Sequence, residues 1–222
     1  MRYNIFHEIH QGLRCLLHET ALELQRSDFA QTEEALRANE SLSRAINLFQ
    51  YHSDTEARSI FSLIKFYEPS VADTFEQERP KDELLTRLLD GSMRLFVSAE
   101  TIAEKLEAGR MIQSAYSQFL VFKLERMMRE EEVLNPLFWY YYSDQELQEV
   151  AKKIIREMPP AYIQSFHQCI LRGLNSYEMN SYNLNRSFKI RNMKHFVWAL
   201  LAIIFREKWV GRMAEQNIHG IL

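Results

Sequence analysis

The sequence contains few of the residues that interrupt helices, with only 6 glycines and 5 prolines among its 222 residues. Because glycine and proline form most tight turns, a fold made of many short strands is not expected. The remaining composition is that of a globular protein, with 46% hydrophobic and 26% charged residues. Long, uninterrupted helices are therefore predicted.

Cysteine and net charge are also scarce. Cys15 and Cys169 belong to no CxxC motif, which excludes a zinc ribbon and a thioredoxin-like redox site. Two reduced thiols in helices suit a cytosolic protein. The net charge of −3 provides no basic excess for binding phosphate backbones, so we predict no nucleic-acid partner.

Long apolar runs are missing as well. The longest, residues 196–205, is about half of the length that a membrane-spanning helix needs. The first residues, MRYNIFHEIHQ, lack the apolar run of a signal peptide. We therefore expect a cytoplasmic protein with no membrane partner, in which residues 196–205 form a buried helix.

Apolar residues recur at steps of three and four over residues 3–25, 32–67, 70–97 and 101–135, which predicts four long helices. Pro69 ends the second helix, and the segment Ser98-Ala99-Glu100 is a candidate cap for the fourth. Pro80 either kinks the third helix or marks the start of its regular part. Short connections between such helices predict an all-α fold, an antiparallel, up-and-down four-helix bundle over residues 1–142.

Shorter helices are expected in a C-terminal extension, residues 143–222, packed on the bundle. They cover residues 144–157, opened by Ser143 or Asp144, then 159–171 and, after a loop at 175–185, residues 192–216. Because the last helix is apolar nearly all round, it needs covering on more than one side. A homodimer formed through the C-terminal helices is one hypothesis for that cover.

Polar residues interrupt the apolar faces of all four long helices. They are His10, His52, Glu56, Arg79, Glu83, Arg126 and Glu130. On three of the helices they come as pairs four residues apart, which places both members on one side. The distances of His10 and His52 along the chain from the first helix connection put these two at similar heights in the bundle. A buried polar layer is therefore predicted, and its charges must pair or bind metal.

Four segments carry a resemblance to a known family: IHQGLR (9–14), YHSDTE (51–56), FEQERPKDELL (75–85) and LERMMREEEVLNP (124–136). In their order and spacing, over about residues 3–142, the chain resembles the hemerythrin-like (HHE) cation-binding proteins. It is most similar to the bacterial subgroup with a helical C-terminal extension. The resemblance implies a four-helix bundle around a non-haem di-iron centre.

The ligand set departs from the family pattern. His10, His52, Glu56 and Glu130 stand at positions that match family ligands. Arg79, Glu83 and Arg126, by contrast, stand where the resemblance implies three histidines. A guanidinium group has no lone pair for a metal.

Two hypotheses follow from that departure. In the first, no cofactor is bound, and Arg79 and Arg126 pair with Glu56, Glu83 and Glu130 in the core of a non-catalytic structural, regulatory or interaction module. In the second, His10, His52 and Glu56, with Glu83 or Glu130, hold one non-haem iron. That iron would serve in sensing dioxygen, nitric oxide or iron, or in redox chemistry. A metal-free carboxylate catalyst is less favoured, because the arginines would lower the carboxyl pKa values.

Overall fold

The structure is a computed structural model that describes residues 2–180. The chain divides into two compact units, Met1–Leu174 and Asn175–Leu222. In the second unit, residues 176–180 are helical, so the predicted loop is wrong for that part of 175–185. The predicted helix at 192–216, on which the homodimer hypothesis depends, lies outside the described residues.

The described residues are almost entirely helical and contain no strand, which confirms the all-α prediction. In chain order the elements are α1 (His7–Arg26), α2 (Thr32–Thr55), η1 (Glu56–Ile60), α3 (Phe61–Lys65), α4 (Pro69–Glu76), α5 (Arg79–Ser98), α6 (Ile102–Arg129), η2 (Glu130–Leu134), α7 (Asn135–Tyr141), α8 (Asp144–Glu157) and α9 (Pro160–Gly173). The elements η1 and η2 are π-helical turns within longer helical stretches.

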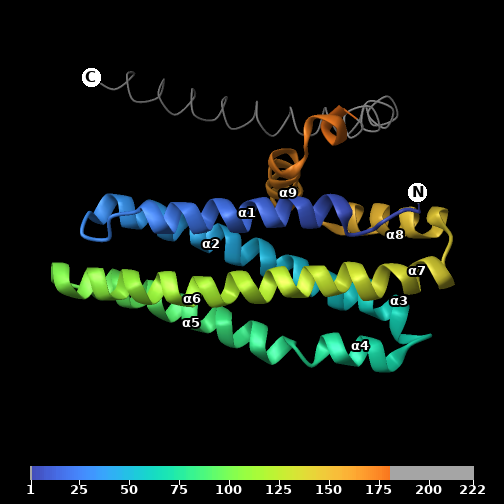
Figure 1. Cartoon of the computed structure of the whole chain (residues 1–222), viewed down its shortest axis with the longest axis horizontal. Helices are drawn as coiled ribbons and strands as arrows, with labels where there is room; N and C mark the ends of the chain where they lie inside the picture. Colours follow the sequence, from blue (N-terminus) through green and yellow to red (C-terminus); the bar gives the residue numbers. More distant parts are fainter. Residues whose placement is uncertain (1, 181–222) are drawn as a thin grey trace, which may run out of the picture. The chain divides into compact units, whose positions relative to one another are not determined.

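These elements form four long stretches within the first unit, namely α1, α2–η1–α3, α4–α5 and α6–η2–α7. Figure 1 shows that they lie side by side and that the chain reverses direction from each stretch to the next. Helix α1 contacts both α2 and α6, while α5 packs on α6. Helices α8 and α9 belong to the same compact unit, and α9 packs on α1. A separate extension beginning at residue 143 stays a prediction.

Local sequence explains where these helices begin. Thr101 caps α6 by accepting a hydrogen bond from the Glu104 N–H, and the Glu104 carboxylate in turn accepts a bond from the backbone N–H of Thr101. The predicted cap at Ser98-Ala99-Glu100 is therefore wrong by one to three residues. Ser143 caps α8 in the same way, as predicted. Pro80 lies in the first turn of α5, where its missing N–H has no helical partner to lose.

Within the described part of the chain, the buried apolar side chains form two clusters. Leu13 and Phe49 belong to the larger cluster, and Phe6 and Phe61 belong to the smaller one. On α1, His10 lies between Phe6 and Leu13 and is completely buried. On the second and fourth stretches, too, buried polar residues lie between residues of the two clusters. Polar residues therefore separate the clusters.

Helices α1 and α9 approach closely at two glycines. A Cβ atom at Gly12 would lie 2.6 Å from the backbone nitrogen of Ile170, and one at Gly173 would lie 2.6 Å from the carbonyl oxygen of Gln11. Because these neighbours are backbone atoms, no side-chain rotation can relieve the overlap. The two glycines therefore permit the crossing that seats α9 on α1.

We predict that Gly12→Ala lowers the free energy of unfolding by about 1–3 kcal/mol, the usual cost of overpacking, because α9 must shift away from α1. The matched control is Gly91→Ala within α5, where nothing lies within 4 Å of the added methyl group. That control is expected to stabilise the protein by about 0.5–1 kcal/mol through helix propensity. Urea unfolding followed by circular dichroism measures both; equal effects would contradict the close crossing.

A candidate metal site between the two apolar clusters

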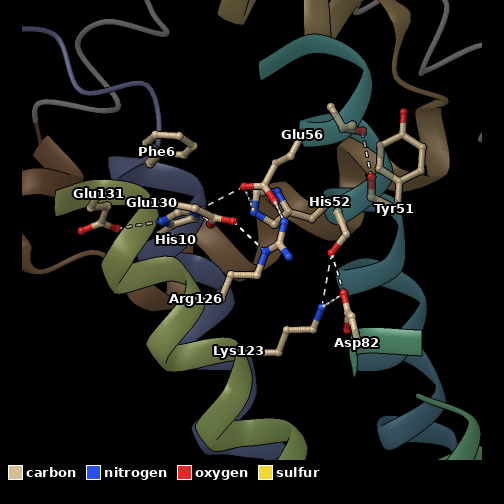
Figure 2. A network of polar contacts seen from close by, with 12 residues as sticks. Phe6, His10, Tyr51, His52, Glu56, Asp82, Lys123, Arg126, Glu130 and Glu131 are labelled. Atoms are coloured by element: carbon tan, nitrogen blue, oxygen red, sulfur yellow. Dashed lines mark hydrogen bonds and ion pairs between the residues drawn. The ribbon is translucent and has the colours of Figure 1, made fainter. Parts of the chain in front are cut away.

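Four side chains that can ligate a metal converge in the polar layer. They are His10 of α1, His52 of α2, Glu56 at the start of η1 and Glu130 at the start of η2. Each offers one ligand atom, and these atoms all lie within 4.8 Å of one another. Figure 2 shows them meeting from three of the four helical stretches. Three of the four are fully buried residues, and His52 is nearly so.

The ring of His10 is oriented by a carboxylate outside the cluster. Its Nδ1 atom lies 2.8 Å from Glu131 Oε1, and the same oxygen accepts a bond of 2.9 Å from Arg14 Nη2. The opposite ring nitrogen, Nε2, faces the cluster, 3.6 Å from Glu130 Oε2 and 3.8 Å from Glu56 Oε1. A carboxylate behind an imidazole is the usual support of a metal-binding histidine, because it fixes the orientation of the ring.

Three atoms that face one another in the cluster have no hydrogen-bond partner among the described residues. They are His10 Nε2, His52 Nε2 and Glu56 Oε1. His52 Nε2 lies 3.0 Å from Glu56 Oε1, but the angles are not those of a hydrogen bond. An unpaired buried polar group typically costs about 1–3 kcal/mol. A shared cation would satisfy all three atoms at once.

The two carboxylates occupy equivalent places in the backbone. Glu56 is the first residue of η1 and Glu130 is the first residue of η2. A π-helical turn contains one residue more than an α-helical turn and changes the direction in which the following side chains point. Such turns are rare and are found frequently at functional sites. Two of them starting at cluster carboxylates support a functional role for this layer.

Arg126 is the one arginine of the predicted set that lies in the layer. Its side chain is 7% exposed, and its Nε donates a bond of 2.8 Å to Glu130 Oε1. Its Nη2 lies 3.9 Å from Glu56 Oε2. The guanidinium therefore approaches Glu130 Oε1 and Glu56 Oε2, whereas the histidines approach the other oxygen of each carboxylate.

Arg79 and Glu83 do not lie in the layer, so the prediction that they pair in the core is wrong. Their side chains are 58% and 51% exposed, and they bond to each other at 3.2 Å on the surface. Arg79 also reaches Asp54, at 3.2 Å. The physical reason is the break between α4 and α5, because the chain restarts its helix at Arg79 with a different face toward the core. Glu83 consequently offers no ligand to the cluster.

Two partners of the layer were not identified from the sequence. Glu131 is not among the residues predicted for the layer, yet its carboxylate binds the buried His10 ring. Lys123 is 4% exposed and pairs with Asp82 at 2.7 Å beside the layer. Spacing along the sequence could have identified Lys123, because it follows the buried Phe119 by four residues on the same side of α6.

The two imidazoles differ in protonation. Burial by itself lowers the pKa of His10, but the bond to Glu131 and the charges of Glu56 and Glu130 raise it to about 9. Burial lowers the pKa of His52. In the absence of a cation, His10 is therefore the protonated imidazole at neutral pH and His52 the neutral one.

The carboxyl groups of Glu56 and Glu130 also differ in protonation. Burial, together with the negative charge of Glu56, raises the pKa of Glu130 to about 8. Burial also acts to raise the pKa of Glu56, but the neighbouring His52, His10 and Arg126 lower it well below its usual range. Without a cation, the layer therefore keeps one carboxylate ionised and the other protonated.

No protein-family model, curated protein or solved structure matches the chain. The resemblance to hemerythrin-like proteins therefore stays a prediction. Over residues 2–180, the helices are too short or too polar for any of them to cross a lipid bilayer.

We predict that the metal-free protein loses stability as the pH rises from 6 to 9. Folding raises the pKa of Glu130 from 4.5 to about 8 and that of His10 from 6.5 to about 9. For both groups the folded state binds the proton more tightly, so the stabilisation is lost as pH rises through the folded-state pKa. Glu130→Gln removes one of these ionisations and should flatten the loss.

Urea unfolding of chelator-treated protein at pH 6, 7, 8 and 9 measures this slope. Glu132→Gln, an exposed neighbour, is the control for the loss of a negative charge on the same segment. If Glu130→Gln and Glu132→Gln keep the same slope as the unchanged protein, the raised pKa of Glu130 does not contribute to stability.

Proposed function

We propose that the protein binds a single non-haem iron ion in this layer, through His10, His52, Glu56 and Glu130. The observation that carries the proposal is the set of buried atoms without hydrogen-bond partners on His10, His52 and Glu56, in a cluster whose candidate ligand atoms lie within 4.8 Å of one another. Two imidazoles with one or two carboxylates form the ligand set of mononuclear iron sites. Iron accepts further ligands beyond these four, which leaves positions for water or a small diatomic molecule.

The arrangement supports one cation rather than two. Arg126 contacts Glu130 at 2.8 Å and lies 3.9 Å from Glu56, so a fixed positive charge already approaches the second oxygen of each carboxylate. A second metal ion there would be repelled by the guanidinium and would find no imidazole. In this proposal Arg126 takes the place of a second ion in a hemerythrin-like, up-and-down four-helix bundle.

The biological role that fits such a site is binding or sensing of dioxygen, nitric oxide or iron itself. A buried iron with open positions can take up a small neutral ligand without moving the helices. The carboxylate of Glu131 behind His10 would hold the imidazole in place, as outer partners of metal ligands do. No catalytic step is assigned to the residues of the layer.

A metal-free, non-catalytic module is the second candidate, and one observation favours it. Arg126 and a protonated His10 can balance the negative charges of Glu56 and Glu131 without any ion, since the pKa of His10 is raised to about 9. In that case the layer serves only to fix the register of the helices.

Iron content distinguishes the two candidates. Chain purified without an affinity tag, stripped with chelator and reloaded with ferrous ion under anaerobic conditions should retain about one iron per chain after gel filtration. His52→Ala removes a ligand and should abolish retention. Arg79→Gln, on the surface, should leave it unchanged.

The support of His10 provides a finer test. Glu131→Gln keeps the shape of the side chain but weakens the charge-assisted bond to His10, so iron affinity should fall by roughly 10- to 100-fold. Competition with a chromogenic chelator measures this change. Failure of the unchanged protein to retain iron, zinc or manganese would reject the metal proposal and leave the metal-free module.

A further inference from the structure

The two cysteines of the sequence lie on the two helices that cross at the paired glycines. Cys15 belongs to α1 and Cys169 belongs to α9. Both are free thiols, of which Cys169 is buried and Cys15 is half-buried. Neither belongs to the candidate metal site. The fold thus brings to one helix crossing two thiols that stand near opposite ends of the described chain.

The close approach at Gly12 fixes the place of Cys169 against α1. A Cβ atom at Gly12 would lie 2.8 Å from the carbonyl carbon of Cys169. Cys15 follows Gly12 by three residues and therefore lies on the same side of α1, about 4.5 Å further along the helix axis. A disulfide joins cysteines whose Cα atoms are about 4.4–6.8 Å apart. The crossing therefore places the two thiols within reach of each other.

An ion pair joins the same two helices one turn beyond the thiols. Arg172 Nη1 lies 3.3 Å from Glu19 Oε2, and Arg172 Nη2 lies 3.8 Å from the Sγ atom of Cys169. Glu19 follows Cys15 by four residues, so it lies on the same side of α1. The side chains of Arg172 and Glu19 are 50% and 43% exposed. The thiols are therefore held between a backbone contact and an ion pair, at an edge that solvent reaches.

The same neighbours influence the ionisation of both thiols. Burial and the carboxylate of Glu19 raise the pKa of Cys15, Arg172 opposes this shift, and a negative charge on Cys169 would add to it. Burial also raises the pKa of Cys169, again against the effect of Arg172. Because the thiolate is the reactive form, reactions of these thiols are expected to be slow at neutral pH and faster in mildly alkaline solution.

We propose that Cys15 and Cys169 form a reversible disulfide that fastens α9 to α1 when the protein meets a low-molecular-weight disulfide such as glutathione disulfide. The thiolate of Cys15, the more exposed of the two, attacks one sulfur of the external disulfide, and the other sulfur leaves as a thiolate. The thiolate of Cys169 then attacks the sulfur of Cys15 and expels the second external thiolate. The leaving thiolates take up the two protons that the cysteines lose, so the external disulfide is reduced to two thiols.

The disulfide would act on the helix from which the second compact unit continues. Helix α9 ends at Gly173, and the second unit begins at Asn175. The bridge would therefore tie the chain that enters this unit covalently to α1, the helix that carries His10. Its formation needs no metal ion, so the inference goes beyond the proposed iron site. The experiment uses chelator-treated protein so that the two proposals can fail separately.

Incubation of the full chain with glutathione disulfide at about pH 8.5, where cysteine thiolate is populated, tests the proposal. Intact-mass spectrometry and peptide mapping should find a monomer that has lost two hydrogen atoms and contains a peptide cross-linked between Cys15 and Cys169. Because the bridge closes a long loop of the chain, it should raise Tm by roughly 5–15 °C. Dithiothreitol should reverse both changes.

Cys15→Ser combined with Leu22→Cys is the matched control. Position 22 is exposed on the same side of α1, two turns beyond Cys15, so the variant keeps two thiols but moves one of them by about 10 Å. It should gain glutathione without an internal bridge, with circular dichroism reporting that the helices are retained. Equal bridging in this variant would overturn the proposal. So would a product of the unchanged chain that carries only glutathione adducts or bridges between chains, or a Tm that does not rise.

Discussion

The rest of the structure depends on the compensation of charge inside an apolar core. Carboxylates and imidazoles can be buried between two apolar clusters only if each finds a partner of the right kind. The bond of Glu131 to His10 and the bond of Arg126 to Glu130 meet part of this need. They also fix which atoms remain unpaired. Those atoms face inward together, and this makes the layer a candidate site rather than only a network of ion pairs.

Periodicity in the sequence predicted the long helices well, because apolar spacing over many residues is a strong signal. The spacing of His52 and Glu56, and the position of His10, also placed them on inner faces. The prediction that Arg79 and Glu83 lie in the core was wrong. The sequence does not decide whether the adjacent Pro80 kinks a helix or marks where its regular part starts. Their exposure follows from a helix break whose effect on side-chain direction depends on tertiary packing, which no local pattern records.

Other features of the site could not be predicted from local sequence patterns, for a different reason. The π-helical turns at Glu56 and Glu130 have no simple sequence signature, since they depend on how neighbouring helices accommodate one extra residue. The partnership of Glu131 with His10 joins residues far apart in the chain. Such contacts become visible only when the rotation of each helix about its axis is known.

Counting the charges explains how the same layer can hold a cation or exist without one. Without an ion, His10 and Glu130 keep protons at neutral pH, because their pKa values are raised to about 9 and about 8. A divalent ion that binds both side chains must displace both protons. Two positive charges then leave and two arrive, so the buried layer keeps its net charge. Because Arg126 remains in both states, the exchange requires no new counter-ion, and this agrees with the proposal of a single ion.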